Sequence, residues 1–544
     1  MASARFDRQD DARVAGRGFL LITAAKVYFM AAGAIISLGL PRLFGDRAMF
    51  GDFSVVNGGI SILNMVMIAG TIQAVSKLVS EREGVTWAAR RAGLIAQCGV
   101  GLPLAGLVFA FAGPIAGALR DPGLAPYIRV ASLIVLFYSF YAVFVGVVNG
   151  EKRFRTQAAL DISFSTLKAF AMLGLVILGF GVLGAFAGFA AAAFAVLLVA
   201  VVVARGSQYR QEIRVPVKRI LWFMLPVMFY TLLVNLMLQG DRLLLKALKF
   251  EPLRDHFAST FGLFQAGLLV APGGLGLPLE GAADEVIGVL AAHATSGLSG
   301  IYGAVKNIAT LPYQGIIAIT FVIFPLISRS TFEQDGARTA AYVRETFRYA
   351  LILLALIVVG LLGASRELIE LLFGASYLCG DTTLSLLLLA IVGFSMFYVG
   401  NIMLTGAGRP MLAASLGCVT VAVYVVLLVA AQQLSGPWRG ALEATALSTL
   451  GAMTFGLLLV GLVLRHLFRA FVPLGTVLRL ILLAAPLWWI ARELPVQGIA
   501  GVLLKGGLAS GGLALGLLLT GELSAEDRAR LRRVLKRDTG RGES

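Results

Sequence analysis

Charge is scarce in this sequence. Asp, Glu, Lys and Arg together make up 14% of the 544 residues, whereas 58% are hydrophobic and the mean hydropathy is +0.86. A surface exposed to water carries far more charge than this, so the composition excludes a set of soluble domains. Lipid must therefore be the main solvent of the chain.

Cysteine and histidine are also rare, with three of each. Cys98, Cys379 and Cys418 are widely separated, so they predict no disulfide framework and no metal site. No cofactor and no catalytic residues are predicted, and we do not expect an enzyme. Glycine, by contrast, is abundant at 63 residues, which suits helices that pack closely in a membrane.

Long apolar runs are the main feature that is present. A run of about 20 residues is enough to cross a hydrocarbon core of about 30 Å. The first run is too long for the core of a signal peptide, so we expect an uncleaved first helix. An all-α integral membrane protein with about fourteen transmembrane helices is predicted, with spans at residues 18–40, 50–76, 92–118, 128–149, 157–179, 182–204, 219–245, 299–328, 343–364, 382–404, 411–431, 440–463, 475–491 and 497–520.

The Lys and Arg residues fall mostly on one side of these spans. With the N-terminus in the cytoplasm, the inside segments hold 31 basic residues and the outside segments hold 10. Retention of basic residues in the cytoplasm produces such a bias. We therefore predict a multi-pass protein of the bacterial inner membrane with both termini cytoplasmic. This orientation also explains the net charge of +16, so no nucleic acid is expected as a partner.

An internal repeat divides the spans. Residues 50–77 resemble residues 299–326, about 249 residues later, and residues 149–153 and 405–409 echo each other at a similar offset. Each pair occupies the same place within six spans, which predicts two pseudo-symmetric six-helix lobes and a C-terminal helical hairpin. Repeated helical bundles with a site between them are typical of transporters.

One segment does not fit the repeat. Residues 246–298 contain an apolar stretch broken by glycine and proline, and counting it as a span would move every later basic loop to the wrong side. We interpret it as an outside loop insertion that is interfacial or re-entrant. The predicted organisation is therefore a cytoplasmic N-terminus (1–17), a first lobe (18–204), a cytoplasmic linker (205–218), a second lobe (219–463), a hairpin (475–520) and a basic cytoplasmic tail (521–544) that forms a short helix on anionic lipid.

Polar residues inside the spans are arranged in stripes. A charge at the centre of a span costs about 2.5–3.5 kcal/mol, so each one asks for a reason. The span at 157–179 carries Gln157, Asp161, Ser165 and Lys168 on one helical face. Two other spans repeat this spacing, one with Thr231, Asn235, Gln239 and Arg242 and the other with Tyr302, Lys306, Thr310 and Tyr313. The span at 50–76 carries Asn57, Ser61, Asn64 and Thr71, and the first span adds Lys26.

Simpler explanations exist for several of these residues. Lys26 and Lys505 could extend toward the interface, Asp241 and Arg242 could pair with each other, and neutral Asn, Ser and Thr often join helices. Lys168 is different because it lies roughly 16 Å into its span, at 1.5 Å per residue. Lys306 lies roughly 10 Å deep by the same measure and continues a stripe. These two lysines favour a cationic, water-filled cavity.

Short motifs in both lobes resemble those of a known family. The run from Gln239 to Leu245, followed by 300–306 and 324–326, resembles the central motif of polysaccharide and oligosaccharide flippases of the Wzx type. Residues 40–45 with 50–53 resemble its first-lobe counterpart. The resemblance covers essentially the whole chain and points to the multidrug/oligosaccharidyl-lipid/polysaccharide exporter superfamily. It implies two six-helix lobes facing each other as a V, with spans 1, 2, 7 and 8 lining a central cavity.

The sequence departs from this pattern in three places. The segment between spans 7 and 8 is much longer than in the family. Spans 13 and 14 exceed a twelve-helix core; related flippases of lipid-linked precursors carry such a hairpin, which implies a role in holding the lipid tail. The first-span signature of peptidoglycan-precursor flippases is not evident, which argues against that substrate.

The resemblance implies a flippase that moves a polyprenyl-pyrophosphate-linked oligosaccharide from the cytoplasmic to the outer leaflet by alternating access. Its partners would be this substrate, membrane lipids, H⁺ or Na⁺, and glycan polymerase or assembly proteins. Asp161 and Asp241 are the ion-coupling candidates. The predicted substrate-binding residues are Lys26, Asn57, Asn64, Lys168, Asn235, Arg242, Tyr302, Lys306 and Tyr313.

Two other functions remain open at this stage. A cation-coupled multidrug exporter of the same superfamily would favour an acidic cavity, whereas the stripes here are basic. A membrane-embedded periplasmic sugar polymerase or ligase would place its chemistry on the 246–298 segment. The acidic and histidine residues of that segment match no catalytic spacing, and a two-lobe repeat has no clear use in such an enzyme.

Overall fold

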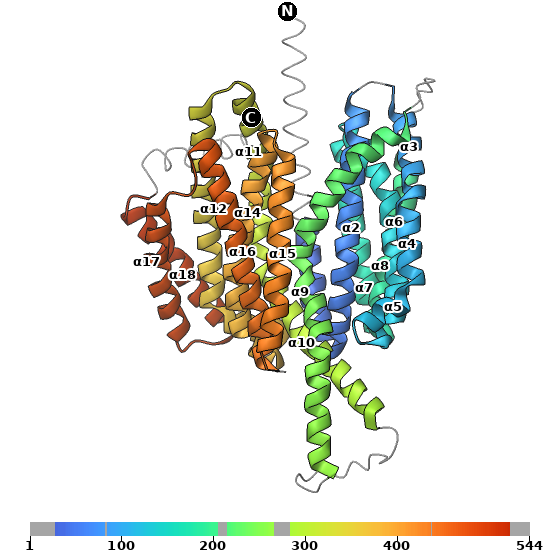
Figure 1. The fold of residues 1–544 in the computed structure, drawn as a ribbon, viewed down its shortest axis with the longest axis vertical. Helices are drawn as coiled ribbons and strands as arrows, with labels where there is room; N and C mark the ends of the chain where they lie inside the picture. Colours follow the sequence, from blue (N-terminus) through green and yellow to red (C-terminus); the bar gives the residue numbers. More distant parts are fainter. Residues whose placement is uncertain are drawn as a thin grey trace, which may run out of the picture. The chain divides into compact units, whose positions relative to one another are not determined.

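The computed structural model describes residue 25 and residues 28–81, 84–204, 215–265, 283–436 and 438–522 (Figure 1). These residues form helices and short connections with no strand among them, so the predicted all-α class is confirmed. The predicted N-terminal segment 1–17, Lys26, most of the linker 205–218 and the helix predicted in the basic tail lie outside the described residues.

The helices follow the predicted spans closely, because long apolar runs leave few alternatives in lipid. A shorter apolar helix, Tyr28–Phe44, precedes the labelled ones. These are α2 (Arg47–Glu81), α3 (Thr86–Gly99), α4 (Gly101–Ala110), α5 (Ala112–Ala118), η1 (Pro122–Leu124), α6 (Ala125–Gly150), α7 (Phe154–Leu175), η2 (Val176–Phe180), α8 (Gly181–Val203), α9 (Val217–Gln265), α10 (Ala283–Ala309), α11 (Leu311–Phe332), α12 (Gly336–Gly363), α13 (Ser365–Phe373), η4 (Ala375–Gly380), α14 (Asp381–Gly406), α15 (Pro410–Leu434), α16 (Arg439–Phe468), α17 (Leu474–Glu493) and α18 (Gly498–Leu519).

Twelve segments of the described chain are long and apolar enough to cross a membrane. One of them, Phe154–Val203, has 50 residues and contains both α7 and α8. Gly179 and Gly181, with φ of 91° and 54°, turn the chain between these helices, and a Cβ at Gly188 would overlap the backbone of Ala171. The protein is thus a multi-pass integral membrane protein, while the count of fourteen spans stays a prediction.

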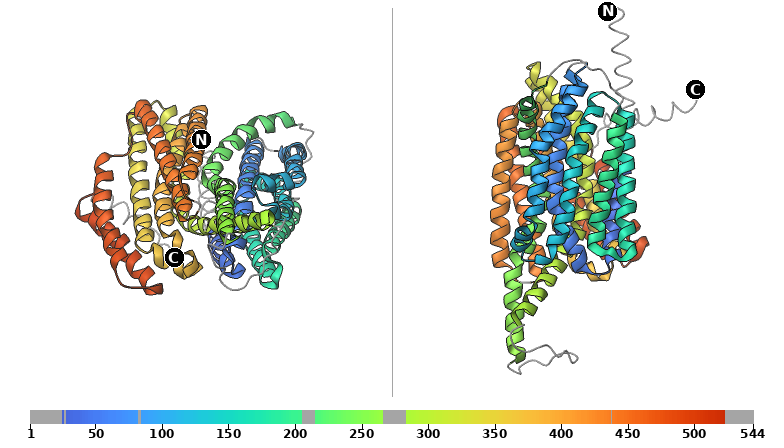
Figure 2. Two further views of the ribbon diagram at one scale, coloured as in Figure 1. Left: turned by 60° about the horizontal axis from the view of Figure 1, so that its bottom comes forward. Right: turned by 90° about the vertical axis from the view of Figure 1, so that its right-hand side faces the viewer.

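The segment predicted as a loop at 246–298 is helical over 246–265 and 283–298, while most of the apolar stretch predicted to be interfacial or re-entrant lies outside the described residues. Helix α9 continues to Gln265 and α10 begins at Ala283, so both flanks of this segment are helical. The two helices run past the ends of their neighbours (Figure 2). The prediction ended the helix where the apolar run ends, but polar residues such as Glu251 and Arg254 continue a helix equally well in water.

The chain divides into two compact units that do not coincide with the predicted lobes. The first unit comprises residues 1–304 with 428–445, and the second comprises 305–427 with 446–544. In the first unit, α2 packs against both α6 and α9, so α9 is grouped with the helices that precede it. The lobe boundaries at 18–204 and 219–463 therefore stay a proposal.

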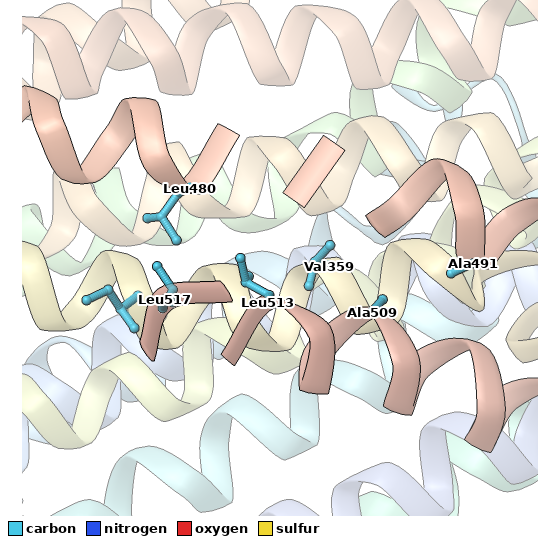
Figure 3. Close-up of a cluster of buried hydrophobic side chains, with 7 residues drawn as sticks. Val359, Leu480, Ala491, Ala509, Leu513 and Leu517 are labelled. Carbon is cyan, nitrogen blue, oxygen red and sulfur yellow. The ribbon is translucent and has the colours of Figure 1, made fainter. Parts of the chain in front are cut away.

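In the second unit, α12 packs against the C-terminal pair α17 and α18. Val359, Leu480 and Leu513 form part of a buried apolar cluster between these helices (Figure 3). Close approach is possible because small residues face each other, and the position of a Cβ at Gly506 lies 3.5 Å from the carbonyl oxygen of Gly360. The predicted C-terminal hairpin is thus attached to the rest of its unit along its length.

Candidate functional site

Helix α9 carries its polar stripe along α2. The two helices run antiparallel: a Cβ at Gly58 would lie 3.8 Å from Cδ of Arg242, whereas one at Gly70 would press on the side chain of Met228. Members of both predicted stripes, Thr71 on α2 and Gln239 and Arg242 on α9, therefore lie at the contact between the two helices. We call this set the polar seam, and it consists of Ser54, Asn64 and Thr71 on α2 and Asn235, Gln239 and Arg242 on α9.

Two amide oxygens in the polar seam lack hydrogen-bond partners in the part of the chain that the structure describes. They are Oδ1 of Asn64 and Oε1 of Gln239, and both atoms are buried. Asn235, by contrast, donates from Nδ2 to the carbonyl oxygen of Thr231 at 2.9 Å. An unsatisfied buried polar atom costs about 1–3 kcal/mol, so water or a ligand is expected to complete the two amides.

The end of the seam at Arg242 holds a buried acidic residue. Asp241 is fully buried and accepts a hydrogen bond from the Tyr302 hydroxyl at 2.7 Å and one from the backbone N–H of Arg242 at 2.9 Å. Arg242 is 5% exposed, and Nη1 of its guanidinium lies 3.4 Å from Oγ of Ser54. Three of the predicted site residues, Asp241, Arg242 and Tyr302, are therefore in contact.

A second charged cluster lies one helical turn further along α9, and the sequence did not lead us to it. Nζ of Lys246 is 3.0 Å from Oδ1 of Asp52 and 2.6 Å from Oδ2 of Asp121, and it also contacts Oγ of Ser296. Lys246 is four residues beyond Arg242 and therefore continues the α9 stripe. That signal was present, but the predicted span ended at 245.

Lys249 extends the same face by another turn. Its side chain is fully buried, and Nζ donates to the carbonyl oxygens of Gln432 (2.7 Å) and Ser435 (3.0 Å) and to the Ser435 hydroxyl (2.8 Å). These acceptors lie at the C-terminal end of α15, where carbonyl groups have no helical partners. Lys249 therefore caps the C-terminal end of α15 and connects that end to the second half of α9.

The remaining basic candidate of the first unit lies in the α7–α8 hairpin. Lys168 is half-buried, and its Nζ is 4.0 Å from the centre of the Phe189 ring. Among the described residues it forms no ion pair. Asp161 occupies the same face of α7, two turns earlier, and its carbonyl oxygen accepts a hydrogen bond from Ser165.

Two candidates belong to the second unit. Lys306, 4% exposed, lies in the last turn of α10, where a cation is favoured by the helix dipole. Tyr313, on α11, packs edge-on against Phe394 and Tyr398 with ring centres 5.1 and 5.5 Å away. Asn57 is half-buried on α2 in the first unit.

Comparison with known proteins agrees with this architecture. Residues 15–252 match the family model described as polysaccharide biosynthesis protein. Among curated protein sequences, none matches the chain significantly. This match covers less than half of the chain and ends at Pro252 on α9, and it agrees with the resemblance to polysaccharide-related proteins read from the motifs.

Solved structures of membrane transporters share the fold. A lipid II flippase MurJ in an inward closed conformation matches with a TM-score of 0.69 at 12% identity, over 92% of this chain and 99% of that one. An inward-facing multidrug resistance MATE family transporter of the MOP superfamily matches with a TM-score of 0.58 at 16% identity, over 82% and 96%. The chain thus has the fold of MOP-type transporters and flippases.

Proposed function

We propose that the protein is a flippase that moves a polyprenyl-pyrophosphate-linked oligosaccharide from the cytoplasmic to the outer leaflet of the bacterial inner membrane by alternating access. The observation that carries this proposal is the polar seam, in which a buried guanidinium and two unsatisfied amide oxygens lie within membrane-spanning helices. Such groups are costly in lipid and are rare unless a substrate or water meets them. The match to a polysaccharide biosynthesis family supports the same substrate class.

The cations suit the diphosphate of such a substrate. Moving a diphosphate through a layer of low dielectric constant is prohibitive unless positive groups compensate its charge. Lys168 is the strongest candidate, because an aromatic ring leaves an ammonium group more available to an incoming anion than a carboxylate would. Arg242, Lys306 and Lys26 complete the proposed set.

The neutral groups suit the sugars. Amides such as Asn64 and Asn235 donate and accept hydrogen bonds, and the edge-on group around Tyr313 offers faces on which sugar rings stack. Asn57 and Tyr302 extend this polar surface. We propose these side chains as the sites that bind the oligosaccharide while the diphosphate lies against the cations.

The coupling ion is proposed to act through a carboxylate. Asp161 is the first candidate, because it lies half-buried on the same face of α7 as Lys168. Asp241 is the second candidate, although its carboxylate already accepts hydrogen bonds from the Tyr302 hydroxyl and the backbone N–H of Arg242. Protonation of either group would change the local charge by one unit and so bias the two access states.

The test is the loss of a single cation. Lys168→Ala and Lys306→Ala should each leave the protein inserted in the membrane but reduce surface glycan at least tenfold in a strain that lacks the wild-type gene. Lys218→Ala, which removes an exposed lysine at the start of α9, should export normally. Full export by both Lys168→Ala and Lys306→Ala would exclude the cationic site.

A multidrug exporter is the second candidate, because the fold of the MATE transporter also fits. Its cationic substrates would need an acidic surface, whereas the polar seam carries Arg242 and the α7 face carries Lys168. Unchanged drug susceptibility in a deletion strain that accumulates glycan repeat units inside the cell supports the flippase. Repeat units that reach the surface but stay unpolymerised would instead indicate a periplasmic polymerase or ligase.

A further inference from the structure

The cluster around Lys246 joins segments that are far apart in the chain. Asp52 and Asp121 belong to α2 and to the turn before α6, and they precede Lys246 by 194 and 125 residues. Ser296 belongs to α10 and also donates a hydrogen bond to Asp52 at 2.6 Å. The Lys246 side chain is fully buried, while those of Asp52 and Asp121 are 23% and 15% exposed.

One further ion pair and one side-chain contact join the same segments. Arg120, next to Asp121, lies 3.2 Å from Glu251 on α9, and His293 on α10 lies 4.0 Å from Asp46 at the start of α2. The contacts thus connect the start of α2 and the turn before α6 with α9 and α10. The bias in basic residues predicts that all of these positions lie on the outside of the membrane.

Backbone packing closes the space beneath these charges. A Cβ at Gly51 would overlap the carbonyl oxygen of Ser296, and one at Gly300 would overlap that of Arg47. Helices α2 and α10 therefore cross in direct contact beside the Lys246 cluster. One turn deeper, Arg242 and Ser54 begin the polar seam. The cluster consequently covers the outer end of the seam.

An ionic joint at this place has a specific physical advantage. Burying an ion pair adds little net stability, because the loss of hydration offsets the attraction between the charges. An apolar contact of equal size would stabilise the helix contact to a similar degree. Separating an apolar contact exposes hydrocarbon at about 25 cal/mol per Å². Separating Lys246 from its carboxylates instead returns all three groups to water. Charges are therefore suited to a joint that opens and closes.

We propose that Lys246, Asp52, Asp121 and Ser296 form a latch that closes the outer end of the polar seam and separates when the seam opens to the outside. The residues that carry the latch are Lys246 on one side and the two carboxylates on the other. The role of the latch in transport rests on the proposed alternating-access mechanism. The latch itself is a property of the protein without substrate, so it can be tested separately.

The experiment measures access to a cysteine beneath the latch. Ser54→Cys is made in a variant that lacks Cys98, Cys379 and Cys418, and right-side-out spheroplasts are treated with a membrane-impermeant maleimide. With the latch intact, labelling should be slow, because position 54 is 2% exposed. Lys246→Met, and the double variant Asp52→Asn with Asp121→Asn, should each raise the labelling rate at least tenfold.

Lys249→Met is the matched control. Lys249 is equally buried and lies one turn further along α9, but its partners are the acceptors of α15 rather than the carboxylates. Its labelling rate should stay within twofold of the parent, and Lys246→Arg should also retain protection. If Lys246→Met does not reach the membrane, Asp121→Asn, which leaves the pair with Asp52, should give an intermediate rate.

Equal labelling rates in all variants, or faster labelling only from the cytoplasmic side of inverted vesicles, would overturn the latch. The readout needs no lipid-linked sugar. Exposure of position 54 in Lys246→Met therefore supports the latch even if the substrate proves to be different. Loss of glycan export with an unchanged labelling rate would instead support the flippase and reject the latch.

Discussion

At the scale of single residues, three buried or half-buried lysines are accommodated in three ways. Lys246 contacts two carboxylates, Lys249 donates to carbonyl and hydroxyl oxygens, and Lys168 faces the Phe189 ring. A lysine between two carboxylates is compensated in charge, whereas one beside a ring retains its positive potential toward an anion. Because of this difference, we propose that Lys168 binds the substrate and that Lys246 belongs to the latch.

Glu522 is a residue-scale case in which pH is informative. Its carboxylate lies beyond α18 and bonds Arg348 on α12 and Thr476 and Arg479 on α17. Burial would raise the pKa of the Glu522 carboxyl, but the hydrogen bonds from Thr476, Arg479 and Arg348 outweigh it and hold the pKa below its usual value. The ionised form is therefore stabilised by folding.

We predict that Glu522→Gln costs about 2 kcal/mol at neutral pH and lowers the melting temperature of the detergent-solubilised protein by about 2–4 °C. Because the folded pKa is lowered, this stabilisation is present above the unfolded pKa and is lost as pH falls through the folded value. The gap in melting temperature between wild type and variant should therefore shrink on acidification.

Glu333→Gln is the control for this prediction. Glu333 pairs with Arg329 at 2.7 Å, but both side chains are exposed, so the pair should contribute about 0–1 kcal/mol. A gap for Glu522→Gln that stays constant down to acidic pH, or one no larger than that of Glu333→Gln, would contradict the assigned role.

At the scale of helices, the crossing of α2 and α10 depends on glycine. We predict that Gly300→Ala lowers the amount of folded protein in the membrane severalfold, because its Cβ would overlap the backbone of Arg47. Gly297→Ala is the matched control on the same helix: it meets nothing within 4 Å, and alanine favours a helix over glycine by about 1 kcal/mol. Immunoblots of membrane fractions and melting temperatures measure both variants. Equal behaviour of the two would show that the helices do not cross in contact.

Much of the helical architecture could be predicted from sequence, and the reason is physical. In lipid every backbone group must be bonded within its own helix, so an apolar run of sufficient length has one available structure. The ends of α6, α14 and α18 lie within a few residues of the predicted spans. The end of α9 beyond residue 245 and the start of α10 were missed, because hydrophobicity alone does not mark a helix that carries polar residues.

The site was predictable only within single helices. Helical spacing identified the stripe that contains Asn235 and Arg242, and the structure places it along α2. The partners of Lys246 could not be found in this way, since Asp52 and Asp121 lie on other elements more than a hundred residues away. Contacts between distant elements depend on tertiary packing, which one sequence without relatives does not encode in any local pattern.

At the scale of the whole molecule, the central claim is that this MOP-type fold moves a lipid-linked oligosaccharide. Under this proposal the cations would compensate the diphosphate, the unsatisfied amides would bind sugars, and the latch would close one end of the polar seam. A drug exporter of the same fold that carries cationic substrates would not need these cations. The claim therefore depends on the cations acting on substrate rather than on the fold alone.

The most direct measurement uses purified protein in liposomes that contain a polyprenyl-pyrophosphate-linked oligosaccharide with a labelled sugar. A membrane-impermeant glycosidase reports the share of substrate in the outer leaflet over time. Wild-type protein should move substrate from the inner leaflet, whereas the double variant Lys168→Ala with Lys306→Ala should match protein-free liposomes. Wild-type protein that leaves the inner-leaflet share unchanged, or a double variant as active as wild type, would contradict the claim.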